Sequence, residues 1–371
     1  MKKEDFLSIF VFLLMLIIAL FIGLRIISNA NVELGYNTAQ SYTFAIITII
    51  VGVLINALIF ELGHVLGALI SGYKIMSVNI FGLCLYRAGK NWKLGFRSYN
   101  GLTGETKIFA KKEKASPKLH LFGPLIMFLI ELAIAIVLFV VLPKDNIFHH
   151  APLIVAGIGA ILIVYNIMPF KLDTATDGYY LMLLSKKVNV SAYNELMRIQ
   201  SLVHENKPLT DLKEFSEITT LTAKVNMYKY YEYLYDEKYE EALAIVENII
   251  SESKAVDEEM LGTAITQKLY ILLVTKPKEA AELYWNNELT VKDRKFIAND
   301  LTIESLRTYL LFNAVVSKSE SEAMFALLRF KKALKRHNDE TRKEQEIALF
   351  DNALLKAKEL NPTWKLEEHK A

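Results

Sequence analysis

The chain has 371 residues, of which 53% are apolar and 23% charged, and its 43 Lys and Arg residues nearly balance its 41 Asp and Glu residues. Its mean hydropathy of +0.25 is high for a soluble protein of this size. A single cysteine, Cys84, excludes a disulfide framework and a cysteine-rich zinc module. The 16 Gly and 8 Pro residues exclude collagen-like and low-complexity proteins.

The two halves of the chain differ in charge. Residues 1–187 carry 17 Lys and Arg against 10 Asp and Glu, a net +7, whereas residues 188–371 carry 26 against 31, a net −5. The basic residues of the first half lie in loops between apolar runs, and the second half is acidic. This distribution excludes a nucleic-acid-binding protein.

Four long apolar runs occupy the first half. Phe6–Leu24 has 19 uncharged residues, which as a helix extend roughly 28 Å and match the hydrocarbon thickness of a membrane. This run is longer than the apolar core of a cleaved signal peptide, so we expect it to be retained. The other runs are Ser41–Ile70, Leu119–Leu142 and Ala151–Phe170. The sequence therefore predicts four transmembrane helices.

The loops between these runs predict the orientation. Residues Tyr73–Lys118 include ten Lys and Arg, whereas Asn29–Ser41 has none and Pro143–Ala151 has one. Because Lys and Arg favour the cytoplasmic side, both termini and the acidic second half are expected in the cytosol. The lysines before the third run either fix this topology alone or also contact anionic lipid headgroups. Short apolar segments between Lys74 and Lys112 predict a β-hairpin and a small sheet.

Charged or polar residues within these apolar runs need an explanation, since a charged group near the bilayer centre costs about 2.5–3.5 kcal/mol on insertion scales. Glu61 and His64 lie three residues apart on one face of the second predicted helix. They nearly match the zinc motif H-E-x-x-H, in which two His residues bind the metal and the Glu acts as general base. Phe60 stands where the first His would be.

A third ligand of such a site would come from the segment after the fourth run. Asn166 and Pro169 form an Asn-x-x-Pro sequence that should end the helix, because proline lacks an N–H. Asp177 and Gly178 then precede a short apolar helix on the same side as His64. Asp177 alone is also well suited to be the N-cap of that helix.

Together these residues resemble the site-2 protease family of intramembrane zinc metallopeptidases, in a Gram-positive branch. That family has a helix with H-E-L-G-H, a membrane-associated hairpin, a Gly-Pro step, and an Asn-x-x-Pro followed by Asp-Gly. This chain supplies, in the same order, Glu61-Leu62-Gly63-His64, the predicted hairpin, Gly123-Pro124, Asn166 with Pro169, and Asp177-Gly178. The resemblance covers roughly residues 42–187.

The resemblance implies a fold class and a division of the chain. We expect an all-α membrane protein whose four transmembrane helices form a site-2-protease-like core with a small β-hairpin region, followed by a cytosolic helical domain. Residues 1–40 would form the first helix and an external loop, residues 41–187 the membrane core, and residues 188–371 the cytosolic domain. The family also implies a multi-pass protein of the bacterial inner membrane.

Two departures from the family pattern bear on activity. Phe60 removes a zinc-ligating His, and Met127 stands where relatives usually carry Asn. A catalytic zinc normally has three protein ligands. With only His64 and Asp177 in their family roles, we predict a pseudoprotease that binds or regulates a membrane-embedded peptide or single-span protein, and whose remaining polar groups hydrogen-bond one another.

Two alternatives stay open. An active intramembrane metalloprotease would use a substituted zinc site of Glu61, His64 and Asp177, with Asp173 and His120 as weaker candidate ligands. In that case Glu61 would no longer be free to act as the general base. In the second alternative, Glu61, His64, Glu131 and Asp177 would form a proton or ion relay in a small transporter. Four predicted helices without an internal repeat argue against this alternative, because transporters commonly contain repeated halves.

Two other polar features of the membrane half have simpler interpretations. Glu131 either pairs with a basic or hydroxyl group inside the bundle or takes a direct role. His149 and His150 fall in the predicted external loop, where we expect them to be solvated.

The second half shows apolar residues at spacings of three and four throughout, which predicts amphipathic helices. Segments that combine acidic residues with alanine recur around Ala242, Ala280 and Ala323, at spacings of 38 and 43 residues. This pattern is typical of a tetratricopeptide-like repeat with irregular length. Such a domain either binds a peptide or protein partner on its concave surface or simply supports the membrane core.

Overall fold

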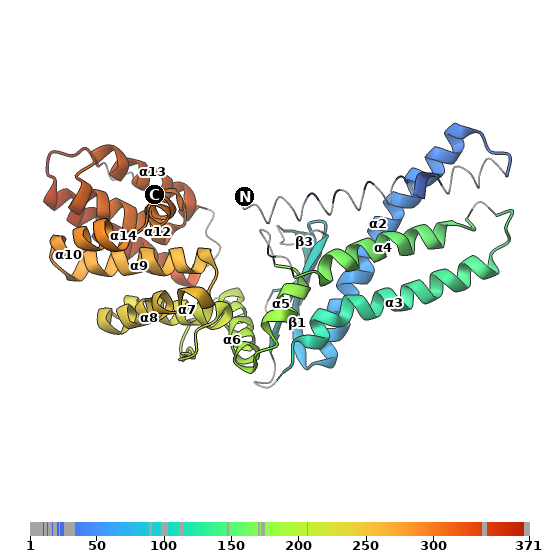
Figure 1. The fold of residues 1–371 in the computed structure, drawn as a ribbon, viewed down its shortest axis with the longest axis horizontal. Coiled ribbons are helices and arrows are strands. Elements are labelled where there is room, and N and C mark those ends of the chain that lie inside the picture. Colours follow the sequence, from blue (N-terminus) through green and yellow to red (C-terminus); the bar gives the residue numbers. More distant parts are fainter. Residues whose placement is uncertain are drawn as a thin grey trace. The chain divides into compact units, whose positions relative to one another are not determined.

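The computed structural model describes residues 34–88, 91–97, 103–110, 115–146, 148–169, 171, 175–205, 207–335 and 340–366, with residues 10, 13, 17, 21 and 23–25 (Figure 1). The first predicted transmembrane helix therefore lies largely outside the described residues. The chain divides into two compact units, Met1–Met197 and Arg198–Ala371. The boundary predicted at residue 187 falls where helix α6 begins, before this division.

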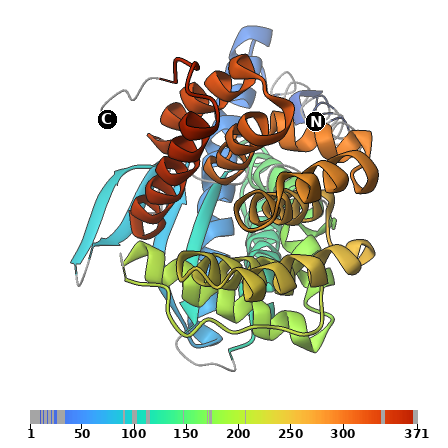
Figure 2. The ribbon, with the colours of Figure 1, turned by 90° about the vertical axis from the view of Figure 1, so that its left-hand side faces the viewer.

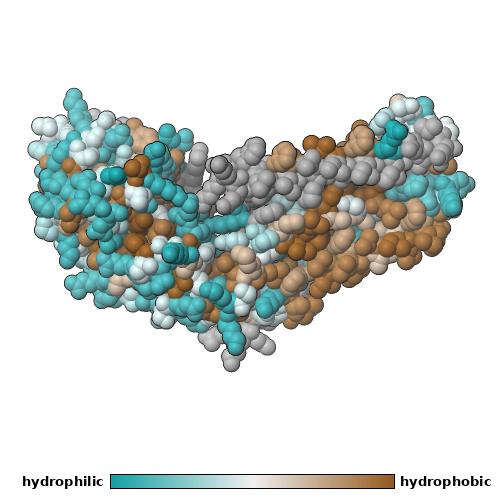
Figure 3. Space-filling view, in the orientation of Figure 1, coloured by the Kyte–Doolittle hydropathy of each residue, from teal (hydrophilic) through white to brown (hydrophobic). Residues whose placement is uncertain are grey.

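Three apolar helices form the centre of the first unit. They are α2 (Thr38–Ile70), α3 (Lys118–Val141) and α4 (Ala151–Ile167). By length and composition α2 and α3 can each cross a membrane, whereas α4 is a shorter apolar helix. Apolar side chains cover much of the outer surface of this unit in Figure 3, while polar side chains predominate on the second unit. These observations confirm a helical protein with two candidate membrane helices.

Glycines allow α2 and α3 to cross in close contact. A methyl group on Gly63 would lie 2.5 Å from the backbone nitrogen of Pro124 and 2.6 Å from the carbonyl carbon of Gly123. A methyl group on Gly67 would lie 2.9 Å from Cα of His120. Real Cβ atoms do not approach backbone so closely. The crossing therefore requires glycine at both positions and brings the two backbones together at the predicted motif.

A four-stranded antiparallel sheet follows α2, with strand order β3-β2-β1-β4. Its strands are β1 (Tyr73–Ile80), β2 (Leu83–Ala88), β3 (Asn91–Phe96) and β4 (Gly104–Ala110). The prediction of a small sheet is confirmed, with pairing of β1 to both β2 and β4. Strands β1 and β4 pack against α2 through Tyr73, Ile75 and Ile108, which are buried with Ala68.

The end of α4 follows the sequence prediction. The helix ends at Ile167, and Met168 adopts an extended conformation, as a residue before proline usually does. Helix α5 (Asp177–Leu183) then begins, with Thr176 rather than Asp177 as its N-cap. Helix α6 (Lys187–His204) follows it.

The expectation that His149 is solvated is wrong. Its side chain is buried at 6% exposure, and its Nδ1 lies 3.0 Å from the carbonyl oxygen of Leu142. Its ring also lies 4.5 Å from that of Phe139. The turn after α3 folds back on the helix end, so the histidine satisfies a terminal carbonyl instead of contacting solvent. His150 is half-buried beside it.

The second unit is helical in its described residues, as the amphipathic pattern predicted (Figure 2). Its main helices are α7 (Thr220–Tyr235), α8 (Tyr239–Ser251), α9 (Glu258–Thr275), α10 (Lys278–Leu283), α11 (Val291–Asn299), α12 (Ile303–Phe312), α13 (Glu320–Leu334) and α14 (Glu340–Leu360). Successive helices α7, α8 and α9 pack on one another, and α12 contacts α9, α13 and α14. One continuous apolar core runs through them. The tetratricopeptide-like repeat stays a prediction.

A buried ionic network crosses this core. Arg307 and Glu346 are fully buried and form an ion pair of 2.6 Å. The guanidinium also donates to Oε1 of Gln267 at 3.0 Å, and Glu346 accepts from the Tyr235 hydroxyl at 2.8 Å. Because these groups come from α7, α9, α12 and α14, they fix how four helices pack.

Candidate functional site

The candidate site lies where α2 crosses α3, beside the first residue of α5. Helix α2 carries Phe60, Glu61 and His64 into this region, and Glu61 and His64 are buried at 2% and 8% exposure. Helix α5 adds Asp177, and α3 adds His120. Residues that are distant in the sequence are thus brought to one place by the close crossing of the helices.

His64 and His120 bind each other's backbone. Nδ1 of His64 lies 3.1 Å from the carbonyl oxygen of His120, and Nδ1 of His120 lies 2.9 Å from the carbonyl oxygen of His64. A carbonyl oxygen only accepts, so Nδ1 must donate in both residues. In a neutral ring this leaves Nε2 without a proton and able to accept or to bind a cation. The two rings lie 4.8 Å apart.

Asp177 completes this cluster from α5. Its Oδ2 lies 3.3 Å from Nε2 of His64, and it also accepts from the amide Nδ2 of Asn166. The backbone N–H of Asp177 donates in return to Oδ1 of Asn166 at 3.2 Å. Burial raises the pKa of Asp177 to about 7, although the Asn166 bond and the nearby His120 lower it. Nε2 of His64 and the carboxyl group of Asp177 therefore face each other directly.

Gly178 is required by the close approach of α5 to the end of α4. A methyl group at this position would meet the carbonyl carbon and oxygen of Ile167, and would lie 3.0 Å from the carbonyl carbon of Met168. The hydroxyl of Thr176 also donates to the Met168 carbonyl oxygen at 2.5 Å. The Asn-x-x-Pro and Asp-Gly segments are thus locked together, which positions Asp177 toward His64.

Glu61 is directed to the sheet. Its Oε2 accepts from the hydroxyl of Thr106 on β4 at 2.5 Å, and its Oε1 would lie 2.8 Å from a methyl group on Gly104. The sequence does not predict Thr106 as a partner of Glu61, because nothing in the strand itself shows which helix residue Thr106 faces. Glu61 therefore has a protein partner of its own, apart from the pair of His64 and Asp177.

Phe60 occupies the position of the missing ligand. It lies one helical turn before His64, and the two rings meet edge to face with centroids 5.2 Å apart. The phenyl ring offers no lone pair to a metal. Gly123 and Pro124 contact α2 at the crossing and hold α3 beside this ring rather than supplying a ligand.

The arrangement does not fit a zinc site of three protein ligands. Among the described residues, no group of three His, Cys, Asp or Glu side chains is placed to hold a metal ion. His64 and Asp177 offer one donor atom each toward a common point, and Glu61 is bound to Thr106. Asp173, another predicted ligand, lies outside the described residues. We therefore derive no chemical step through zinc.

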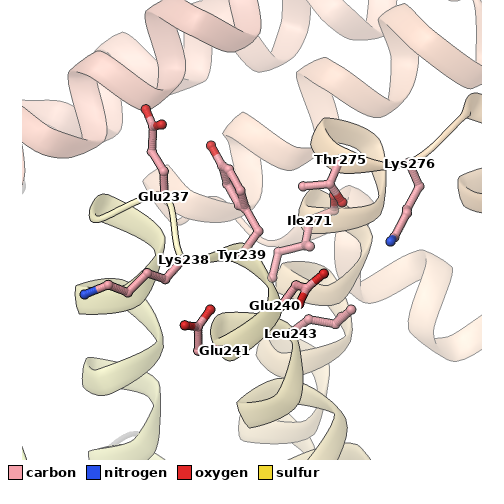
Figure 4. Close-up of a pocket in the computed structure, with 9 residues that line it drawn as sticks. All are labelled: Glu237, Lys238, Tyr239, Glu240, Glu241, Leu243, Ile271, Thr275 and Lys276. Carbon is pink, nitrogen blue, oxygen red and sulfur yellow. The ribbon is translucent and has the colours of Figure 1, made fainter.

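A cavity of about 500 Å³ lies in the second unit, at the turn between α7 and α8 (Figure 4). It is lined by Glu237, Lys238, Tyr239, Glu240, Glu241, Leu243, Ile271, Thr275 and Lys276. These residues include the acidic segment that suggested a repeat. Glu237 adopts a left-handed conformation with φ of 57°, which forms the turn.

No known protein family, curated protein or solved structure matches this chain.

Proposed function

We propose that this protein is a membrane pseudoprotease with a site-2-protease-like core, which binds a membrane-embedded peptide or single-span protein without cleaving it. The observation that carries the proposal is that the retained polar groups are bound to protein partners. His64 pairs with Asp177, Asn166 bonds to Asp177, and Glu61 accepts from Thr106.

Physical chemistry explains why such groups persist at a site that lacks a third ligand. A polar group without a partner costs several kcal/mol in the hydrocarbon region. In this chain His64 and Asp177 are partners for each other, with 3.3 Å between Nε2 and Oδ2. Phe60 closes the remaining position with an apolar ring. The cluster then serves to hold α2, α3 and α5 together around a binding surface.

The alternative is an active metalloprotease with a substituted site of Glu61, His64 and Asp177. Glu61 is disfavoured as a ligand because it accepts a hydrogen bond from Thr106. His120 is favoured over Glu61 as the third ligand, since its ring lies 4.8 Å from that of His64. His120 would have to turn its Nε2 to the same point as His64 and Asp177 to complete a set of three.

The proposed membrane topology is the one that the apolar runs and the basic loop of the sequence predict. Four transmembrane helices would place both termini in the cytosol of a bacterial cell, with the protein in the inner membrane. The helical second unit would then bind a protein or peptide partner on the cytosolic side, or support the membrane core. The lining of its cavity, which combines charged side chains of both signs with apolar ones, suits a peptide.

Metal analysis of the purified protein tests the proposal. We expect the unaltered protein to contain far less than one zinc per chain, and Phe60→His to contain about one, because positions 60 and 64 then present two imidazoles on one helix face. Phe60→Leu is the matched control and should stay metal-free. One zinc per chain in the unaltered protein would overturn the pseudoprotease, and its loss in His120→Asn would identify the third ligand.

A further inference from the structure

The cavity at the start of α8 in the second unit has an apolar floor. Tyr239 and Leu243 of α8 are half-buried, Ile271 of α9 is buried, and all three line the cavity. Its volume of about 500 Å³ lies in the range of clefts that hold small ligands. Water in this cleft contacts apolar surface, so an occupant with an apolar stem gains free energy by covering that surface.

Acidic side chains surround this floor. Glu237, Glu240 and Glu241 line the cavity and are exposed. None of the three forms an ion pair with another residue that the structure describes. Their carboxylates are therefore free to pair with a positive charge that an occupant brings.

The two lysines of the lining do not offset these carboxylates. Lys238 is already paired, because its Nζ lies 2.9 Å from Oδ2 of Asp236. Figure 4 shows Lys238 and Lys276 at opposite edges of the cavity, with Glu240 between them. Within the described part of the chain, Lys276 is the one cation of the lining without a carboxylate partner, so the cavity carries a net negative charge.

An anionic occupant is disfavoured for a second reason. The first turn of a helix attracts negative charge, and the first turn of α8 borders the cavity. In this helix Glu240 and Glu241 already occupy the first turn. A phosphate group or a peptide carboxylate would be repelled by these two side chains, whereas a cation would be attracted by them.

We infer that this cavity binds a Lys or Arg side chain from the cytosolic segment of a single-span membrane protein. The aliphatic stem of such a side chain would cover the apolar floor, and its charged head would reach the glutamates. Segments that flank a transmembrane helix on the cytosolic side are rich in Lys and Arg, so a single-span protein supplies this chemistry. The choice of this partner rests on the proposed function, whereas the preference for a basic side chain rests on the cavity itself.

The test measures peptide binding to the full-length protein in nanodiscs of zwitterionic lipid, whose surface does not attract basic peptides by charge. Three fluorescent peptides share one neutral sequence and carry Lys, Gln or Glu at two central positions beside a Leu. Fluorescence polarisation at physiological ionic strength gives their dissociation constants. We expect the Lys peptide to bind roughly threefold to tenfold more tightly than the Gln peptide, and the Glu peptide to bind most weakly.

Two triple variants separate the cavity from the general acidity of the second unit. The first removes the three carboxylates of the lining and should abolish the preference for the Lys peptide; it combines Glu237→Gln, Glu240→Gln and Glu241→Gln. The matched control changes the net charge equally at three exposed residues outside the lining and should keep the preference; it combines Glu252→Gln, Glu344→Gln and Glu359→Gln.

A single variant locates the site independently of the glutamates. Thr275 is an exposed residue of the lining on α9. Thr275→Arg brings a competing cation into the cavity, so it should also abolish the preference for the Lys peptide while all three glutamates remain.

The two proposals can fail separately. Equal affinity of the unaltered protein for the Lys and Gln peptides, or tighter binding of the Glu peptide, overturns the cavity inference. Equal loss of the preference in both triple variants also overturns it, because the acidity of the whole unit would then attract the peptide. One zinc per chain, or cleavage of a single-span protein, overturns the proposed function and leaves the measured preference for Lys intact.

Discussion

The crossing of α2 and α3 at Gly67 gives the sharpest test of how the site is assembled. A methyl group at this position would meet the backbone of Leu119, with the carbonyl carbon 2.7 Å away, and Cα of His120 at 2.9 Å. Ordinary contact begins at 3.4 Å. In Gly67→Ala the two helices must therefore separate by at least about 0.7 Å, since backbone atoms cannot turn aside.

That separation acts directly on the reciprocal histidine bonds. The distance from Nδ1 of His64 to the His120 carbonyl would grow from 3.1 Å, and the opposite bond from 2.9 Å, so that both exceed hydrogen-bond range. Overpacking costs about 1–3 kcal/mol. Each lost interhelical bond in a membrane adds roughly 0.6 kcal/mol. We expect Gly67→Ala to lower the free energy of unfolding by about 2–4 kcal/mol.

Unfolding in mixed detergent micelles measures this difference, with Gly157→Ala as the matched control. A methyl group on Gly157 would have no heavy atom within 4 Å. The control variant should therefore be as stable as the unaltered protein or slightly more stable, because alanine favours the helix. Equal stability of Gly67→Ala and Gly157→Ala would refute the close crossing and the geometry of the site that depends on it.

Two further predictions concern the buried polar groups. Arg307→Met should destabilise the protein by about 3–5 kcal/mol, because it removes the closest cation from the buried Glu346 and leaves Arg342 at 3.7 Å as its remaining ion-pair partner. Arg307→Met with Glu346→Leu should recover most of this loss. Urea unfolding followed by fluorescence measures both, and equal loss in the two variants would contradict the prediction. Thr106→Val should lower the free energy of unfolding by about 1–3 kcal/mol, as measured by thermal unfolding, because it removes the hydroxyl that donates to Glu61. Glu61→Gln should be tolerated, because the Gln side-chain oxygen can still accept from Thr106. Greater damage from Glu61→Gln than from Thr106→Val would argue that Glu61 has another role.

Much of the first unit could be predicted from apolar runs and helix-ending signals. The runs gave α2, α3 and α4 within a few residues, and Pro169 marked the end of α4. The small sheet followed from its short apolar segments. The pairing of His64 with His120 was missed, although Gly63 and Gly67 form a small-xxx-small pattern that indicates close helix packing.

Other features depend on contacts between segments that are distant in the sequence. Thr106 faces Glu61 because of how β4 pairs with β1, and no local pattern reports that. Arg307 and Glu346 are 39 residues apart and meet inside a helical core.

Phe60 borders both the histidine cluster and a small cavity of about 10 Å³ that is also lined by Asn56 and Glu131, and this affects what His at position 60 would contact. The new imidazole would have two competing partners: a zinc ion shared with His64, or the carboxyl group of Glu131 as an acceptor. A charge-assisted hydrogen bond of about 1.5 kcal/mol would weaken zinc binding by roughly tenfold. Adding Glu131→Leu removes the acceptor, so Phe60→His with Glu131→Leu should bind zinc about tenfold more tightly than Phe60→His alone.

Competition titrations with a zinc chelator measure both affinities, and Glu131→Leu alone is the control that should bind no metal at this site. Equal zinc affinity in the single and double variants would show that a side chain at position 60 faces only His64. A single change at Phe60 would then govern metal binding without affecting the cavity, and the two sites would have to be treated as independent.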